Sequence, residues 1–217
     1  MFKGFSPRTL EFMFNIRFNN NKAWFDEHKQ EYLQDFYNPM KALGQAVLQR
    51  MQVDFPDRGL FVKTARIYRD ARRVRDGKPY RDNLWFTIES AAPYSAFWFD
   101  LTPENWIYGM GFWPNAALMA KLRARMEQNP KKVERLIAPL EKQSEFTLEG
   151  EEYARKKSSP SQKLAPWYNK KCIVLAHRQK NSEELYSPDL ADRLAEGFKF
   201  LMPFYEYISE VGSDPTP

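Results

Sequence analysis

The stretch that decides the fold is residues 84–112, LWFTIESAAPYSAFWFDLTPENWIYGMGF. It contains three short runs that are rich in aromatic and β-branched residues, which favour strands. These runs are 84–89, 94–101 and 106–112. The turn residues Ala92-Pro93 and Thr102-Pro103-Glu104-Asn105 separate them. The pattern predicts an antiparallel meander, and a similar run at 60–68 extends the expected sheet region to residues 60–112.

Helical patterns flank this sheet region on both sides. Ser6-Pro7, Asn21 and Asn38-Pro39 are helix-start signals, because a short polar side chain caps free N–H groups and proline suits the first helical position. Apolar residues at helical spacing then predict helical regions at 6–52, 114–142 and 187–210, with Pro203 expected to kink or restart the last helix.

The remaining segments complete a predicted α+β domain that spans residues 1–212, in which helices pack against an antiparallel sheet. The region 150–178 is expected to hold a long polar surface loop at 150–171 and a short strand at Cys172–Ala176. Residues 213–217 are expected to form a disordered tail. No stretch before that tail resembles a linker, so we expect one domain.

Two glycines, Gly109 and Gly111, share one face of the last strand of the meander. A bare strand face admits either a closely packed element or a ligand. We expect close packing here, because a glycine in mid-strand marks a place where another part of the protein or a ligand lies close to the backbone, and the glycines alone do not identify a ligand.

The cysteine content bears on the compartment. Cys172 is the only cysteine, which excludes an internal disulfide and fits a reducing compartment. The chain has no signal-like start and no run of roughly 18 apolar residues, so we expect a soluble, cytoplasmic protein without membrane association. The apolar flank Ile173-Val174-Leu175 predicts a buried, unreactive thiol at Cys172.

Familiar catalytic motifs are absent. One cysteine and two distant histidines, His28 and His177, give no metal-ligand spacing, so we predict neither a metal site nor a cofactor. No phosphate loop, dinucleotide fingerprint or nucleophile elbow occurs. His28 lies on an apolar helical stripe between Trp24 and Tyr32, which favours a packed imidazole over a general base.

Charge is concentrated in one segment. Residues 63–82 contain eight basic and three acidic side chains, a net charge of +5 that equals the net charge of the whole chain. If this segment is extended, alternate arginines project to the same side and can bind a phosphate or carboxylate through forked hydrogen bonds. The predicted ligand-binding residues are Arg66, Arg69, Arg72, Lys78, Tyr80 and Arg81.

Three hypotheses remain for this segment. It binds a small anionic ligand, and if the protein is an enzyme Asp70 or Tyr68 handles a proton, with His28 as a further candidate. Alternatively, the same strip contacts nucleic-acid phosphates while Tyr80 or a sheet aromatic stacks on a base. In the third, the charges form internal ion pairs at a hinge or subunit contact. The pattern predicts neither the reaction nor the oligomeric state.

Several motifs together resemble the uncharacterised family called domain of unknown function 2461. They occur in order over residues 1–126: Phe2-Lys3-Gly4-Phe5, Asn20-Asn21-Lys22-Ala23-Trp24-Phe25, Tyr32, Pro39, Arg66-Ile67-Tyr68-Arg69-Asp70-Ala71-Arg72, Pro79-Tyr80, Gly109-Met110-Gly111, Pro114 and Arg123. The chain departs from the family pattern at Arg73, Gly77 and Arg81, and residues 150–171 match it poorly. The resemblance implies no established activity.

Overall fold

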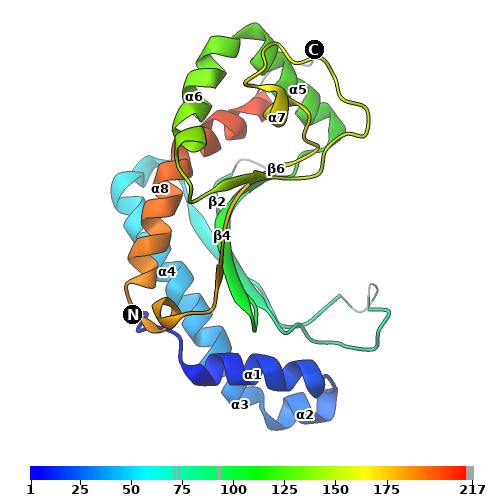
Figure 1. The fold of residues 1–217 in the computed structure, drawn as a ribbon. Coiled ribbons are helices and arrows are strands. Elements are labelled where there is room, and N and C mark those ends of the chain that lie inside the picture. Colours follow the sequence, from blue (N-terminus) through cyan, green and yellow to red (C-terminus); the bar gives the residue numbers. More distant parts are fainter. Residues whose placement is uncertain (71, 73, 92–93, 214–217) are drawn as a thin grey trace. The chain divides into compact units, whose positions relative to one another are not determined.

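A six-stranded antiparallel sheet runs in the order β1-β2-β3-β4-β6-β5 (Figure 1). The structure is a computed structural model and describes residues 1–70, 72, 74–91 and 94–213. The strands are β1 Phe61–Thr64, β2 Leu84–Glu89, β3 Ser95–Leu101, β4 Asn105–Phe112, β5 Thr147–Glu149 and β6 Ile173–Lys180. The predicted meander is confirmed, because β2, β3 and β4 are neighbours in chain order.

Helices precede, follow and interrupt the strands, which confirms the α+β class. The α-helices are α1 Pro7–Phe18, α2 Lys22–Glu27, α3 Lys29–Glu31, α4 Asn38–Asp54, α5 Ala116–Gln128, α6 Pro130–Lys142, α7 Ala165–Tyr168 and α8 Leu190–Ser209. The other helical segments are the π-helical η1 Tyr32–Tyr37 and the 3₁₀ turns η2 Pro56–Arg58, η4 Glu183–Tyr186 and η5 Glu210–Ser213. Among the described residues, no helix is both long and apolar enough to span a membrane.

The helix-start signals are confirmed in part. Asn21 Oδ1 accepts a hydrogen bond from the Trp24 N–H at 3.0 Å and caps α2. Asn38-Pro39 does not start a helix from a loop, because the π-helical η1 runs directly into α4 and Asn38 keeps helical backbone angles. Nor does Pro203 restart the last helix, since α8 continues through it.

Chain contacts divide the molecule into two units, the first of which contains residues 1–88, 98–108 and 178–196. Its core is aromatic: Phe86 stacks on Phe99 with ring centroids 5.7 Å apart, and Phe12 packs against Phe36 at 5.8 Å. Helix α4 packs closely in this unit, because a Cβ on Gly44 would lie 3.1 Å from the Phe86 ring. This core supports the ends of the strands that carry the basic segment.

The second unit contains residues 89–97, 109–177 and 197–217, of which 92, 93 and 214–217 lie outside the described residues. The expected tail therefore falls outside the description from residue 214 onward, while Ser213 ends η5. The core of this unit includes Phe97, whose ring lies 4.4 Å from that of Tyr205. The predicted one-domain span over 1–212 stays a prediction.

Close packing explains the paired glycines of β4. A Cβ on Gly109 would lie 1.9 Å from the Leu175 carbonyl oxygen, and one on Gly111 would lie 2.2 Å from the Trp113 indole. Both contacts are shorter than real Cβ contacts, so a side chain at either position would displace its neighbour. The bare strand face is therefore filled by the protein itself.

Three expectations for residues 150–180 need correction. The segment 150–171 is not wholly a surface loop, because it contains α7 and buries Trp167 and Tyr168. Strand β6 is longer than the expected run Cys172–Ala176, because it extends to Lys180 and includes His177. Cys172 is half-buried and not enclosed, because it precedes β6 at the point where the chain emerges from the loop.

Candidate functional site

Residues 66–81, here called the arm, connect β1 to β2 and carry most of the concentrated positive charge. Figure 1 shows the arm, in teal, as a long loop that extends from the ends of the strands. Its two limbs pair at one antiparallel bridge between Tyr68 and Tyr80. The Arg69 N–H donates to the Pro79 carbonyl and the Arg81 N–H to the Ile67 carbonyl, each at 2.8 Å. These bonds fix the register of the base of the arm.

The base of the arm is anchored to the segment between α1 and α2. The Asn20 side chain donates to the Tyr80 carbonyl and accepts from the Tyr80 N–H, both at 3.0 Å, so its amide replaces a neighbouring strand. The Phe25 ring stacks on the Tyr80 ring at 4.3 Å. Tyr80 is consequently only 5% exposed. The polar residues on the limb that carries Tyr80 are therefore held in place.

A pocket of about 400 Å³ lies at this junction. Polar and charged side chains form almost all of its lining, with Tyr80 as the one aromatic member. The lining residues are Arg17, Asn20, Arg69, Asp76, Lys78, Tyr80, Arg81, Asp82 and Asn83. Four cationic and two acidic side chains leave this lining a net charge of +2. The pocket lies within the first unit and its volume is within the range of small-molecule sites.

Arg69 is held by the far limb of the arm. Its Nη1 donates to both oxygens of Asp76, at 2.8 and 2.9 Å, and to the Lys78 carbonyl at 3.0 Å. The hydrogen bond from Arg69 lowers the pKa of Asp76 below its usual value. Gly77, at φ +69, adopts the left-handed conformation that the turn after Asp76 requires. The pair neutralises one of the four cations while keeping it at the pocket.

Arg81 is positioned without a carboxylate. Its Nη1 donates to the Tyr68 carbonyl, and to the Arg66 carbonyl at 3.3 Å, while its guanidinium lies 5.0 Å from the centre of the Trp85 ring. Burial, and secondarily the positive charge of Arg69, lower the pKa of Arg81. Within the described part of the chain, neither Arg81 nor Lys78 forms an ion pair. These two cations are the uncompensated charges of the pocket.

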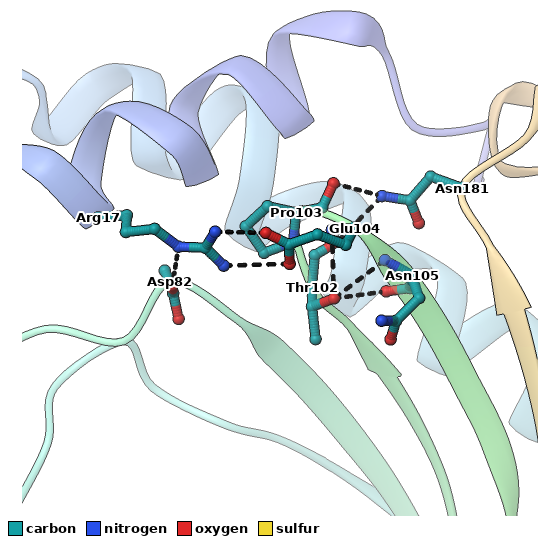
Figure 2. Close-up of polar contacts among 7 residues, drawn as sticks. All are labelled: Arg17, Asp82, Thr102, Pro103, Glu104, Asn105 and Asn181. Carbon is teal, nitrogen blue, oxygen red and sulfur yellow. Dashed lines mark hydrogen bonds and ion pairs between the residues drawn. The ribbon is translucent and has the colours of Figure 1, made fainter.

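Arg17, at the end of α1, bridges two carboxylates, as Figure 2 shows. Its Nε donates to Asp82 at 2.5 Å, and its two terminal nitrogens donate to both oxygens of Glu104. Both hydrogen bonds raise the pKa of Arg17, and the same contact lowers the pKa of Glu104. Arg17 therefore fixes the position of Asp82 at the pocket wall.

The turn that carries Glu104 is itself rigid, as the same view shows (Figure 2). Thr102 Oγ1 donates to the Asn105 carbonyl at 2.9 Å and accepts from the Asn105 N–H at 3.0 Å. The Asn181 amide donates to the Thr102 and Pro103 carbonyls at 3.1 and 2.7 Å. These hydrogen bonds fix the turn, so Glu104 is held where it accepts hydrogen bonds from the Arg17 guanidinium.

Asn83 is oriented by a half-buried carboxylate on β3. Its Nδ2 donates to Asp100 Oδ1 at 2.9 Å. Burial raises the pKa of Asp100, which the hydrogen bond from Asn83 partly opposes. An ionised carboxylate only accepts hydrogen bonds, so the amide nitrogen faces Asp100 and the Oδ1 of Asn83 points away from it. That oxygen has no partner among the described residues.

The structure brings together four of the six predicted ligand-binding residues, Arg69, Lys78, Tyr80 and Arg81. The other two lie outside the pocket lining. Arg72 turns back to Asp70, with its Nε and Nη2 at 3.1 and 3.0 Å from the two carboxylate oxygens, and its side chain is 88% exposed. Arg66 is exposed, and its carbonyl accepts from Arg81.

None of the three predicted catalytic candidates lines the pocket. Asp70 pairs with Arg72, as described above. Tyr68 is 52% exposed, and its ring lies 5.5 Å from that of Tyr80. His28 stacks on the Trp24 ring at 4.0 Å, and its Nδ1 lies 2.8 Å from the Trp24 carbonyl. His28 is therefore packed within its own helix region.

The lining also includes residues that the sequence did not single out, namely Arg17, Asn20, Asp76, Asp82 and Asn83. Asn20 belongs to one motif of the family resemblance, which was the available signal for it. Arg17 lies 65 residues from Asp82 in sequence, so no local pattern joins them. Among the described residues, no group of three or more His, Cys, Asp or Glu side chains is placed to hold a metal ion.

A family model matches this chain. The model of a family described as conserved hypothetical protein (DUF2461) matches residues 8–207, nearly the whole chain. The match extends the resemblance seen over residues 1–126 through the segment 150–171. No curated protein matches the chain.

Proposed function

Since the chain belongs to the DUF2461 family, whose description names no activity, we propose a function from the pocket itself: the protein binds a small anion that bears a phosphate or carboxylate group. The observation that carries this proposal is the pair of uncompensated cations, Lys78 and Arg81, in a pocket of about 400 Å³. Arg69 adds a third cation whose other guanidinium nitrogens remain available beside its bond to Asp76.

The electrostatics of Arg69 and Arg81 support the same proposal. The positive charge of Arg69 disfavours the charged form of Arg81, which burial also disfavours. An anion bound near both guanidinium groups offsets this repulsion, and forked N–H groups suit phosphate and carboxylate oxygens. We therefore expect a bound anion to stabilise the protein by offsetting the repulsion between the two guanidinium groups.

The proposal is one of binding, and we assign no reaction. A general acid or base must come within hydrogen-bond reach of the group on which it acts. Asp70, Tyr68 and His28 do not line the pocket, so they are not assigned a catalytic role.

A second candidate function uses the exposed face of the arm. The side chains of Arg66, Arg72 and Arg75 are exposed, and Tyr68 is 52% exposed. Basic side chains beside an open aromatic ring are the elements that bind single-stranded nucleic acid without sequence preference. Tyr68, rather than the buried Tyr80, is the ring that supports this alternative.

Thermal unfolding in the presence of inorganic phosphate tests the anion proposal. A ligand at a hundredfold excess over its Kd stabilises the folded state by about 2.7 kcal/mol. For a chain of this size, that gain corresponds to a rise in Tm of roughly 5–10 °C. We expect Arg81→Gln to abolish most of the gain and Arg135→Gln, an exposed position on α6, to keep it. An unchanged Tm of the wild type in phosphate would contradict the proposal.

Oligonucleotide binding at several salt concentrations tests the alternative. If Arg66, Arg72 and Arg75 each neutralise one phosphate of a single strand, the log-log salt slope is about −2. Arg72→Gln then reduces the slope by about 0.7. A response to phosphate without oligonucleotide binding favours the pocket, and a response to neither contradicts both proposals.

We also propose that the protein resides in the cytoplasm. The support is its single cysteine, Cys172, which fits a reducing compartment. Fractionation of cells that express the tagged protein tests this, and recovery outside the cytoplasmic fraction would contradict it.

A further inference from the structure

The pocket combines cations with hydrogen-bond acceptors, and this combination narrows the class of ligand. Two of the lining cations, Arg17 and Arg69, already pair with Asp82 and Asp76. Lys78 and Arg81 are then the two cations of the lining without a carboxylate partner among the described residues, although Glu104, which shares Arg17 with Asp82, lowers the net charge of the whole group to +1. A phosphate monoester carries a charge of about −1.5 to −2 at neutral pH, whereas a single carboxylate carries −1. The two unpaired cations therefore favour a phosphate monoester over a single carboxylate.

The acceptors indicate what the rest of the ligand carries. The Oδ1 of Asn83 lacks a partner among the described residues, and the hydrogen bond to Asp100 holds the amide in one orientation. The neighbouring Asp82 gives only its Oδ2 to Arg17, which leaves its other oxygen able to accept. Oxygens of this kind would repel a phosphate, but they accept hydrogen bonds from hydroxyl groups.

A nucleobase fits this pocket poorly. Proteins commonly stack a base on an open aromatic face, and Tyr80 is the only aromatic residue of the lining. Its ring is stacked by Phe25 at 4.3 Å and flanked by Tyr68 at 5.5 Å, and the residue is 5% exposed.

We propose that the pocket binds a phosphate monoester of a hydroxylated carbon skeleton, such as a sugar phosphate, with Lys78 and Arg81 on the phosphate and Asn83 and Asp82 on hydroxyl groups. This inference rests on the proposed function and specifies its ligand. In this proposal Asn83 contacts only ligands that carry hydroxyl groups, whereas Arg81 contacts the phosphate group of every ligand.

Calorimetric titration of the wild-type protein with three probes tests the inference. The probes are methyl phosphate, ribose 5-phosphate and uridine 5′-monophosphate, with inorganic phosphate as the reference. We expect ribose 5-phosphate to bind about tenfold more tightly than methyl phosphate, the gain of one or two good hydrogen bonds. The nucleotide should bind no more tightly than ribose 5-phosphate.

Asn83→Leu removes the acceptor while keeping a similar side-chain volume. We expect it to reduce the tenfold preference to about one, so that ribose 5-phosphate loses about tenfold more affinity than methyl phosphate. Because this change also removes the partner of Asp100, circular dichroism must show that the variant folds. The wild-type probe series decides the question if the variant does not fold.

The outcomes separate the two proposals. Equal binding of methyl phosphate and ribose 5-phosphate overturns the ligand class and leaves the anion pocket intact. Much tighter binding of the nucleotide also overturns the ligand class, as does an equal loss of both phosphates in Asn83→Leu. If none of the probes binds, inorganic phosphate included, the proposal that the pocket binds an anion is overturned.

Discussion

Replacing Arg123 by methionine should destabilise the protein strongly, although Arg123 is remote in sequence from the basic segment. Arg123 lies on α5 and is only 6% exposed. Its Nε donates to the Tyr168 carbonyl at 3.0 Å and its Nη2 to the Lys170 carbonyl at 3.5 Å. The guanidinium also lies 4.6 Å from the centre of the Tyr153 ring. One side chain thus ties three points of the segment 150–171 to α5.

The magnitude follows from these contacts. The 3.0 Å bond from a charged donor contributes about 1.5–3 kcal/mol, and the 3.5 Å bond is at the limit of useful geometry and contributes little. Contacts with the Tyr153 and Tyr168 rings add about 0.5–1 kcal/mol each. Methionine keeps much of the volume and removes the cost of burying the charge, so we expect a net loss of about 3 kcal/mol. The corresponding fall in Tm is roughly 6–12 °C.

Thermal and urea unfolding, followed by circular dichroism, measure this loss. Arg123→Lys should lose most of the same stability, because an ammonium cannot reach two carbonyls and two rings with a planar fork. Arg135→Met on α6 is the matched control, since Arg135 is exposed, and should stay within about 0.5 kcal/mol of the wild type. A loss below about 1 kcal/mol in Arg123→Met would refute the reasoning that this guanidinium holds the segment.

Three further predictions concern single positions. Gly109→Ala should cost about 3 kcal/mol or more in urea unfolding, because its Cβ would lie 1.9 Å from the Leu175 carbonyl oxygen, and a loss under 1 kcal/mol would contradict this. Burial raises the pKa of Asp100, so its contribution to stability is full below the unfolded-state pKa and is lost as pH rises through the folded-state pKa. Asp100→Asn should therefore gain stability over the wild type at pH 7 but not at pH 3, and an equal effect at both would count against it. The half-buried Cys172 thiol should react with a thiol reagent more slowly in the native protein than in urea, and equal rates would show full access.

The strands could be predicted from sequence because period and composition are local properties. The runs at 84–89, 94–101 and 106–112 correspond to β2, β3 and β4 within one residue at each end. Helix starts were less certain, because a cap signal does not reveal whether the chain enters it from a loop or from another helix. Asn38 is an example, because the residues that precede it, in η1, are already helical.

The candidate site was predictable only as a concentration of charge. Alternation along an extended strand would place Arg66 and Arg72 on one face, but the arm pairs at a single bridge and Arg72 turns back to Asp70. Arg72 therefore pairs with the Asp70 carboxylate, two residues away, instead of projecting from an extended strand. Arg17 and Asn20 reach the pocket through tertiary contacts, which no pattern within the segment could indicate.

Among the described residues, the contacts of Arg17 add no net negative charge to the basic segment. Asp82, one of only three acids within residues 63–82, pairs with Arg17, a cation from another element. Glu104 arrives with Arg17 and balances it, so this contact adds one cation and one anion and changes the local net charge by nothing. If this segment were neutralised internally, carboxylates would lie beside Lys78 and Arg81. Because like charges held together raise the free energy of the folded state, the proposed anion should increase the stability of the protein when it binds.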